Sequence, residues 1–312
     1  MKLVNFQIGG DAAARLGLAI GGRILDVRGE SALAGVGSGT RELLPASSDD
    51  YLRGSEASRL ALRRLADAAA RRDSDSGAGG VYREQEVEFL PPVLRPGKVI
   101  AAGRNFHEHL TEAREKRGVA TRTPSVPIGF IKVASALTAH RRPIVVPEWV
   151  ENVDYESELV LVIGKVADGV KEEDALSYIA GFTVGNDVSA RRIQFAERES
   201  GGGSCAGKNV RTFGPMGPYL VTADEVPDPM RLRVWSRVNG ELRQDALTTD
   251  MIFDIKKLVA WYSQIGLDPG DMIMSGTPAG VAIGGKGFLM PGDTVQCGVD
   301  GIGVLENLVM RA

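Results

Sequence analysis

The stretch from Asp154 to Gly164 constrains the fold of this chain more than any other. Two glutamates, Glu156 and Glu158, stand directly before the apolar run Leu159–Ile163. Residues two apart in a β-strand point to the same face, so both carboxylates should lie beside side chains that read as buried. Two like charges in a partly buried setting repel each other and are costly to remove from water. A fold that keeps them there needs a compensating cation.

A metal ion is the cation that this pattern favours. Oxygen ligands suit a hard ion such as Mg²⁺ or Mn²⁺, and Ca²⁺ is a third candidate. A further carboxylate, Asp187, follows the next strand-like run, Ala180–Val184. Taken alone, however, the Glu-x-Glu pattern favours the alternative, in which Glu156 and Glu158 lie on the solvent face of an ordinary half-exposed strand, where most charged side chains lie.

The first 95 residues are predicted to form a small N-terminal α/β domain. The runs Leu3–Ile8 and Leu16–Ile20 are strand-like, and Gly21-Gly22 is a turn signal before a hairpin partner at Arg23–Val27. An Ala-, Leu- and Arg-rich segment predicts one helix over Tyr51–Arg72. A polar, Gly- and Ser-rich stretch at 73–80 and a cluster of prolines then place a domain boundary near residue 95.

Residues 96–312 are predicted to form a larger, β-rich domain. The 39 glycines of the chain indicate many tight turns and hence many short strands. Lys98–Ala102 reads as a buried strand, and short strand-like runs follow Pro218, broken by turn signals such as Asn239-Gly240. One helix, Asp250–Ile265, interrupts them. We expect an α+β, β-rich fold with a roll or barrel of short strands and a few helices.

Composition excludes several classes of function. The net charge of −3 argues against a nucleic-acid partner, which would favour a basic face. No apolar stretch is long enough to span a membrane, and the first residues do not read as a secretory signal. Two cysteines, Cys205 and Cys297, make no disulfide framework. We expect a cytoplasmic protein without a nucleic-acid or membrane partner.

Several separate motifs, in order from about residue 97 to 310, resemble the fumarylacetoacetate hydrolase family. They are Asp154–Gly164, Gly185–Arg191, Gly217-Pro218, Val238–Glu241, Gly276–Gly280 and Pro291–Asp293. The resemblance implies that Glu156, Glu158 and Asp187 bind a divalent metal, Mg²⁺ or Mn²⁺. It also implies a mixed β-roll or β-sandwich catalytic domain and a homodimer.

The family usually carries Asn-Tyr-x-x-His-x-x-Glu near the start of its catalytic domain. Here Asn105–Glu112 matches this pattern, on a helix predicted over Asn105–Arg117 with Asn105 as N-cap, Glu108 completing a capping box and Gly118 as a stop. The match places His109 and Glu112 as a catalytic dyad, in which the carboxylate one turn away orients the imidazole as a general base. The alternative is a surface helix with solvated histidines. Phe106 replaces the family's tyrosine and lacks its hydroxyl.

Two lysines match further family positions. Lys132 matches a lysine near the metal, and Lys208 matches one that holds a substrate carboxylate or oxyanion. Gln194, Thr277 and Arg104 are further candidates for substrate contacts. Two segments depart from the family pattern: Asn209–Thr212 reverses a charge beside the expected site, and residues 197–206 replace a loop that commonly carries an aromatic residue.

The resemblance implies a metal-dependent enzyme that acts on a small 2-oxo acid. The leading hypothesis is hydrolysis of a C–C bond in a β-diketo acid of the acylpyruvate or fumarylpyruvate type. The alternatives are an isomerase or tautomerase, or a decarboxylase, acting on a related acid such as oxaloacetate or 2-hydroxyhepta-2,4-diene-1,7-dioate. A non-catalytic binding protein would be expected to lose the ligand carboxylates or the dyad, and this sequence keeps both.

Overall fold

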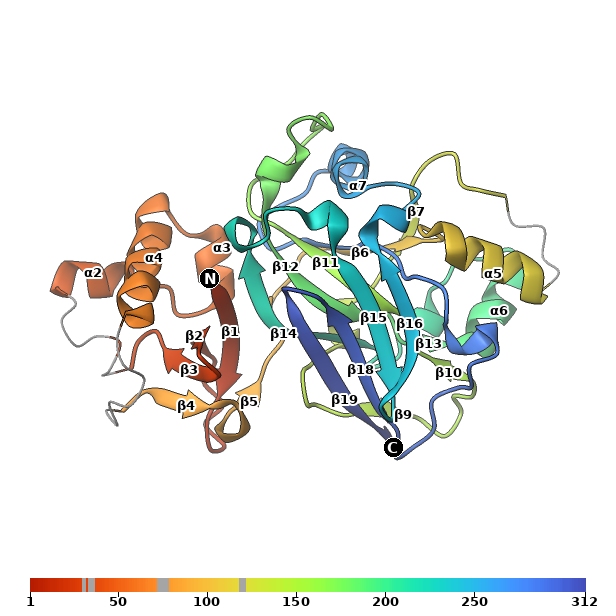
Figure 1. The fold of residues 1–312 in the computed structure, drawn as a ribbon, viewed down its shortest axis with the longest axis horizontal. Helices are drawn as coiled ribbons and strands as arrows, with labels where there is room; N and C mark the ends of the chain where they lie inside the picture. The colour runs from red at the N-terminus through yellow and green to blue at the C-terminus, as the bar shows by residue number, and fades with distance from the viewer. Residues whose placement is uncertain (30–31, 33–36, 72–78, 118–121) are drawn as a thin grey trace.

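The computed structural model describes residues 1–29, 32, 37–71, 79–117 and 122–312. Within them, the largest unit is a twelve-stranded mixed sheet that runs through the whole molecule (Figure 1). Its main path, in spatial order, is β4 (Val81–Arg83), β3 (Arg23–Asp26), β2 (Arg15–Ile20), β1 (Lys2–Gln7), β14 (Gly214–Thr222), β12 (Ile179–Asn186), β11 (Ser157–Ile163), β17 (Met272–Met274), β6 (Val99–Gly103) and β7 (Ile128–Ile131). Off this path, β5 (Glu88–Phe89) pairs with β1 and β8 (Leu137–Ala139) pairs with β14.

Two smaller sheets and six α-helices complete the described structure. The five-stranded sheet has the order β16 (Glu241–Leu247), β15 (Arg233–Val238), β18 (Thr294–Val299), β19 (Gly303–Arg311) and β9 (Ile144–Val146), and the two-stranded sheet pairs β10 (Val153–Asp154) with β13 (Ser189–Ala190). The helices are α2 (Ser38–Leu43), α3 (Ser48–Arg53), α4 (Glu56–Ala70), α5 (His107–Arg117), α6 (Arg191–Glu199) and α7 (Ile255–Tyr262). This β-rich α+β architecture agrees with the fold class expected from the sequence.

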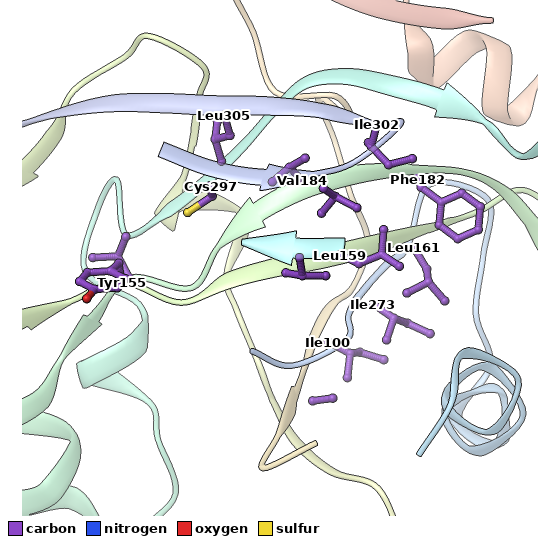
Figure 2. Close-up of a cluster of buried hydrophobic side chains, with 14 of the residues drawn as sticks. Ile100, Tyr155, Leu159, Leu161, Phe182, Val184, Ile273, Cys297, Ile302 and Leu305 are labelled. Atoms are coloured by element: carbon purple, nitrogen blue, oxygen red, sulfur yellow. The ribbon is translucent and has the colours of Figure 1, made fainter. Parts of the chain in front are cut away.

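The main apolar core lies between the large sheet and the five-stranded sheet. Figure 2 shows Leu159 and Leu161 of β11 and Val184 of β12 packed toward Cys297 of β18 and Leu305 of β19. All five side chains are at most 1% exposed. Burial of apolar side chains from both sheets in one layer is the main force that holds the sheets together.

Strand β11 is buried on both faces, as its apolar sequence predicts. It pairs antiparallel with β12 on one side and with β17 on the other. Its odd-numbered residues face the core between the sheets, whereas Val160 and Val162 face a second apolar cluster. A strand in this central position cannot shift its register by one residue without burying the wrong face, so the residues at its start are placed precisely by packing.

The N-terminal residues extend the large sheet. The predicted hairpin is confirmed, with β2 and β3 joined at Gly21-Gly22. Strand β1 pairs antiparallel with β14, and the N-terminal strands and helices lie at the left of Figure 1. Leu3, Leu52 and Leu62 pack in the same apolar cluster as Val160 and Val162. The domain boundary near residue 95 stays a prediction.

The single helix predicted over Tyr51–Arg72 is wrong, because the chain forms two helices here. Helix α3 ends at Arg53, and Ser55 begins α4 by accepting a hydrogen bond from the backbone N–H of Ser58. A Cβ atom on Gly54 would lie 2.4 Å from the Asp50 carbonyl oxygen. Local capping therefore outweighs the helix propensity of the flanking alanines and leucines. Residues 72–78, most of the predicted Gly- and Ser-rich stretch, lie outside the described residues.

The predicted N-cap of α5 is also wrong. The helix begins at His107, and the Asn105 side chain turns inward, where its amide donates to the carbonyl oxygens of Ser275 (2.8 Å) and Phe253 (2.9 Å). Asp250, from a distant segment, contacts the start of the helix instead, because its Oδ2 accepts a hydrogen bond from the backbone N–H of Glu108. The predicted stop, Gly118, lies outside the described residues.

The helix predicted over Asp250–Ile265 is shorter in the structure. Helix α7 begins at Ile255, where Asp254 accepts a hydrogen bond from the backbone N–H of Lys257. Short 3₁₀ turns, Thr248–Asp250 and Ser263–Ile265, lie at the two ends of the predicted range, and residues 251–254 are not helical. Within the described part of the chain, no helix has the length and apolar character needed to cross a membrane.

His140 is buried between the end of β8, in the large sheet, and β19, in the five-stranded sheet. Its side chain is 7% exposed, its Nδ1 accepts the Glu306 N–H (3.0 Å), and its ring meets the Phe89 ring edge-on. Burial, with a smaller contribution from Arg141, lowers the pKa of His140 from 6.5 to about 4. Between these values the unfolded chain binds a proton that the folded chain excludes, so stability falls as the pH falls.

We predict that this histidine contributes roughly 3 kcal/mol of stability at neutral pH, which is lost as the pH falls from 6.5 toward 4. His140→Asn keeps an acceptor for the Glu306 N–H but does not titrate, so its free energy of unfolding should fall less steeply over this range. Denaturant unfolding at several pH values measures the effect. His107→Asn, which removes an exposed histidine, should follow the original protein. Equal pH dependence in the His140→Asn protein would contradict the prediction.

Candidate active site

Three carboxylates meet where β11 begins and β12 ends. Ser157 of β11 pairs with Asn186 of β12, so Glu156 and Glu158 lie opposite the turn that carries Asp187. One oxygen from each of the three side chains lies within 4.8 Å of the others. The residues are 6%, 1% and 2% exposed. The structure thus brings together the three residues singled out in the sequence, and the alternative of a solvent-facing Glu-x-Glu pair is wrong.

Three cations surround this carboxylate cluster. Lys208 Nζ lies between Glu156 Oε2 (2.6 Å) and Asp187 Oδ2 (2.7 Å). Lys132 Nζ lies 2.9 Å from Asp187 Oδ1, and Arg191 Nη2 lies 2.5 Å from Glu156 Oε1. Such buried charges are tolerated only when they are paired and hydrogen-bonded. Glu158, the third carboxylate, accepts the backbone N–H of Gly276 through Oε2 (2.8 Å).

The pKa values show an uneven charge balance in the cluster. Burial alone would raise the pKa of Glu156, but the charges of Lys208, Arg191 and His109 outweigh it and lower that pKa well below its usual range. Burial, and then repulsion from Asp187 and Glu156, raise the pKa of Glu158 well above its usual range. Burial lowers the pKa of Lys132, against the attraction of Asp187. A cation placed beside Glu158 would relieve this repulsion, so the three carboxylates fit a divalent metal ion.

Gly276 allows its loop to reach Glu158. Its φ is +95°, and a Cβ atom there would lie 2.8 Å from the Cβ of Asn105. Asn105 hydrogen-bonds the carbonyl oxygen of Ser275 and also accepts the Phe253 N–H. A glycine is required at 276 because any side chain would push the two loops apart and remove the N–H from Glu158.

The carboxylate cluster opens into a cavity of about 780 Å³. Most of the residues predicted from the sequence to form the site line this cavity: Glu156, Glu158, Asp187, His109, Lys208, Gln194, Thr277 and Arg104. Helices α5 and α6, which carry His109 and Gln194, lie at the right of Figure 1, at the end of the molecule away from the N-terminal strands. Residues more than 150 positions apart in the sequence thus share one concave site.

His109 and Glu112, the predicted dyad, lie close together, but the two side chains are too far apart for a hydrogen bond. His109 Nδ1 lies 3.9 Å from Glu112 Oε2, and this oxygen accepts the Gly280 N–H (3.1 Å). The two side chains are 16% and 11% exposed, which contradicts the alternative of a fully solvated surface helix. Phe106 is completely buried in the main core, where the tyrosine hydroxyl absent from this chain would need a buried partner.

Lys132 does not line the cavity. It is 1% exposed, and its Nζ donates to the carbonyl oxygens of Lys208 (2.5 Å) and Phe213 (2.9 Å) as well as pairing with Asp187. This environment gives it a supporting position beneath Lys208 and Asp187, in contrast to the catalytic contact expected from the sequence.

Gln194 and Thr277 line the cavity but have protein partners. Gln194 accepts from Arg191 Nη1 (2.8 Å) and donates to Ser204 Oγ (3.2 Å). The Thr277 hydroxyl donates to the Ser157 carbonyl oxygen (2.9 Å) and accepts from a glutamine side chain. The hydroxyl contact to substrate expected for Thr277 therefore competes with two existing hydrogen bonds.

The segment Asn209–Thr212, one of the two that depart from the family pattern, carries no charge into the cavity. Arg211 is exposed and lies outside the cavity lining. Asn209 holds the local loops, since its side chain accepts the Val133 N–H (2.7 Å) and donates to the carbonyl oxygens of Ile131 and Cys205. The charge reversal expected beside the site thus falls on the outside of the molecule.

Sequence reasoning missed three residues that organise the site. Arg191 bridges Glu156 and Asp154, with Nε 2.7 Å from Asp154 Oδ2. Asp154 also accepts the backbone N–H groups of Ala282 and Ile283. The signal was available, since Arg191 stands three residues before Gln194, one helical turn away, and its motif had already been recognised.

Glu197 is the third missed residue. Its carboxylate accepts the backbone N–H groups of Cys205, Ala206 and Gly207, the residues directly before Lys208. The loop at 200–206 has little apolar surface of its own to bury. A charge-assisted set of hydrogen bonds from α6 therefore anchors it in place of packing.

Comparisons with known proteins identify the family of this chain. The family model described as Fumarylacetoacetate (FAA) hydrolase C-terminal matches residues 98–310. A protein of Bos taurus, the mitochondrial oxaloacetate tautomerase FAHD2B, is 38% identical over 99% of this chain and 92% of its own length. It is an enzyme, as its name states.

Two solved structures share the fold over the full length of both chains. Maleylpyruvate hydrolase from Sphingobium sp. SYK-6, in complex with manganese(II) and pyruvate, has a TM-score of 0.74 and 29% identity. The 5-carboxymethyl-2-hydroxymuconate delta-isomerase from Mycobacterium smegmatis has a TM-score of 0.71 and 28% identity. Together with the matched family model and the buried carboxylate cluster, these likenesses show that the chain belongs to the fumarylacetoacetate hydrolase family.

Proposed function

We propose that this protein is a divalent-metal-dependent tautomerase that interconverts the enol and keto forms of a small 2-oxo acid. The observation that carries the proposal is a buried cluster of three carboxylates that opens into the same cavity as His109. The relative named as an oxaloacetate tautomerase matches almost the whole chain at 38% identity, which favours tautomerisation over the hydrolysis expected first from the sequence.

Glu156, Glu158 and Asp187 would hold Mg²⁺ or Mn²⁺. Their all-oxygen donor set suits these hard ions, and a similar protein binds manganese together with pyruvate. When bound, the ion would supply Lewis-acid stabilisation to the oxygen atoms of a 2-oxo acid. Lys208, which is fixed between Glu156 and Asp187, adds a positive charge beside the place where negative charge develops on the substrate.

His109 would carry the proton between the enol hydroxyl and the adjacent carbon. It lines the cavity, and the carboxylate of Glu112, 3.9 Å away, favours its charged form after it has accepted the proton. Hydrogen bonds of this kind often shorten only when the substrate is present. Tautomerisation consumes no water and leaves the carbon skeleton intact, so one such group and a charge-stabilising environment suffice.

The second candidate function is hydrolysis of a C–C bond in an acylpyruvate or fumarylpyruvate type of acid. The likeness to maleylpyruvate hydrolase, at 29% identity over the whole of both chains, favours it. In that reaction His109 would take a proton from water, which then attacks the distal carbonyl carbon. Decarboxylation of oxaloacetate shares the same site and is a third outcome of the assay. A homodimer and a cytoplasmic location stay predictions.

The test starts from protein stripped of metal with EDTA and then supplied with Mg²⁺ or Mn²⁺. Enol–keto exchange of oxaloacetate is followed by ultraviolet absorbance, and products from oxaloacetate, acetylpyruvate and fumarylpyruvate are identified by mass spectrometry. Metal-dependent acceleration of exchange without new products is the expected result. Cleavage to two acids would replace the tautomerase by the hydrolase, and release of CO₂ would replace it by a decarboxylase.

Glu158→Gln should abolish metal-dependent turnover. The amide has nearly the same shape but lacks the charge, so we expect Mg²⁺ or Mn²⁺ affinity to fall on the order of 100-fold or more. Calorimetric titration of the metal measures this directly, without substrate. Glu115→Gln makes the same chemical change at an exposed position on α5 and should leave the affinity unchanged. Equal metal affinity in the Glu158→Gln and original proteins would exclude Glu158 as a ligand.

His109→Gln should keep metal affinity but lower kcat on the order of 100- to 10,000-fold, because it removes the group that moves the proton. His107→Gln, which changes an exposed histidine two residues away, is the matched control and should retain full activity. Steady-state kinetics of enol–keto exchange, together with metal titration, separate the two effects. Unchanged kcat in the His109→Gln protein would exclude this histidine as the general base.

A further inference from the structure

Gln244 is a buried amide that joins the five-stranded sheet to the large sheet behind the carboxylate cluster. It belongs to β16, is 0% exposed and lies outside the cavity lining. Its Oε1 accepts the backbone N–H of Ser157 on β11 (3.0 Å). Its Nε2 donates to the Thr277 hydroxyl (2.8 Å) and to the Pro278 carbonyl oxygen (2.9 Å). The amide therefore uses both of its N–H groups and its oxygen on two segments that border the site.

Ser157 needs these partners because it lies beyond the end of a paired strand. Strand β17 pairs with β11 at residues 160–162. Nearer the start of β11, the Ser157 N–H meets Gln244 instead, and the Ser157 carbonyl oxygen accepts the Thr277 hydroxyl (2.9 Å). A buried backbone group without a partner costs about as much free energy as a lost hydrogen bond. Two side chains thus replace strand pairing at the residue between the two glutamates of the cluster.

Ser157, Gln244 and Thr277 form a closed ring of hydrogen bonds. The Ser157 N–H donates to Gln244, the Gln244 amide donates to the Thr277 hydroxyl, and that hydroxyl donates back to the Ser157 carbonyl oxygen. The loop after β17 also packs tightly on β16, since a Cβ atom on Gly280 would overlap the Arg243 carbonyl oxygen. A buried polar network in which every member is satisfied is rigid, so the loop is held at a fixed distance from the start of β11.

Glu158 depends on the position of this loop. Its Oε2 accepts the N–H of Gly276, the residue directly before Thr277. The other two carboxylates of the cluster repel Glu158, so without this hydrogen bond its side chain would turn away from them. Gln244 can therefore act on Glu158 through the ring and Gly276, although it does not touch the carboxylate.

We propose that Gln244 is a positioning residue for the metal site, which keeps Glu158 in place by fixing the loop after β17 against the start of β11. The proposal rests on the metal-binding part of the proposed function. Gln244 contacts neither the metal nor the substrate, so its effect is on metal affinity.

Gln244→Met tests this role, because methionine has a similar length but cannot make the three hydrogen bonds. Loss of a side chain that orients a metal ligand typically lowers affinity by roughly 10- to 100-fold. We expect a loss of this size in Mn²⁺ affinity, measured by calorimetric titration of EDTA-treated protein with Mn²⁺ and without substrate. Equal Mn²⁺ affinity in the folded variant and the original protein would overturn the proposal.

Asn5→Leu is the matched control for the loss of a buried amide. Asn5 is 1% exposed, and its amide likewise accepts one backbone N–H and donates to a hydroxyl and to the carbonyl groups of prolines. It lies on β1, among the N-terminal strands at the left of Figure 1. Its Mn²⁺ affinity should equal that of the original protein. An equal loss in both variants would overturn the proposal, since reduced stability alone would then explain it.

Thermal unfolding separates a role at the metal site from a purely structural one. Both variants should unfold at a lower temperature than the original protein, because each leaves buried groups without partners. A fixed concentration of Mn²⁺ should raise the unfolding temperature of the Asn5→Leu protein as much as that of the original protein. The rise should be smaller for Gln244→Met, because its affinity is lower. An equal rise in all three proteins would contradict the assigned role.

Thr277→Val opens the ring at its other side chain and provides the test if the Gln244→Met protein does not fold. Valine has the shape of threonine but lacks the hydroxyl, so the hydrogen bonds to Gln244 and Ser157 are lost. Mn²⁺ affinity should fall roughly 5- to 30-fold, which corresponds to one or two neutral hydrogen bonds. Unchanged affinity in this variant would overturn the proposal.

Failure of the proposed function has a different signature. If the original protein binds Mn²⁺ but accelerates no reaction of a 2-oxo acid, the tautomerase proposal fails, and Gln244 is still judged by the Mn²⁺ affinities. If the original protein turns over a 2-oxo acid and Gln244→Met binds Mn²⁺ as tightly as the original, the Gln244 proposal fails alone. If the original protein binds no Mn²⁺ or Mg²⁺, both proposals fall.

Discussion

The electrostatic balance around three buried carboxylates governs the arrangement of this site. Glu156, Glu158 and Asp187 are almost completely buried, and desolvated charges of one sign are stable only with partners nearby. Lys132, Lys208 and Arg191 supply positive charge to Glu156 and Asp187, whereas Glu158 has a backbone N–H and a strongly raised pKa. The remaining imbalance of charge suits the cluster to a divalent cation better than to a closed ion-pair network.

This balance depends on packing far from the cavity. Strand β11 is fixed by apolar side chains on both faces, including a cluster that contains Leu3 and Leu62 from the N-terminal segment. Because neighbouring strands fix its register, the carboxylates at its start cannot slide away from Asp187. Asn105 and Glu197 perform the same task for the loops, since each holds backbone groups beside a cavity-lining residue. The cavity-lining residues are therefore held in place by packed strands and by hydrogen-bonded loops.

Sequence reasoning was most accurate where chemistry and local periodicity agreed. The buried strand over the apolar run Leu159–Ile163 and the Gly-Gly hairpin were both read correctly from the chain. It was least accurate at helix boundaries, where the outcome depended on partners distant in sequence. Asn105 is a residue type that commonly caps helices. Its side chain instead donates hydrogen bonds to the buried carbonyl groups of Phe253 and Ser275.

The sequence by itself determined the donor set, the β-rich architecture and the family, because residue types at short spacing carry that information. Tertiary structure alone decided which cations face the cavity. Lys132 was expected to make a catalytic contact and Arg211 to place a charge beside the site, but Lys132 is enclosed beneath the carboxylates and Arg211 lies on the surface. Arg191 acquired its position beside Glu156 only when strands and loops distant in the chain came together, since burial and charge pairing are properties of the assembled fold.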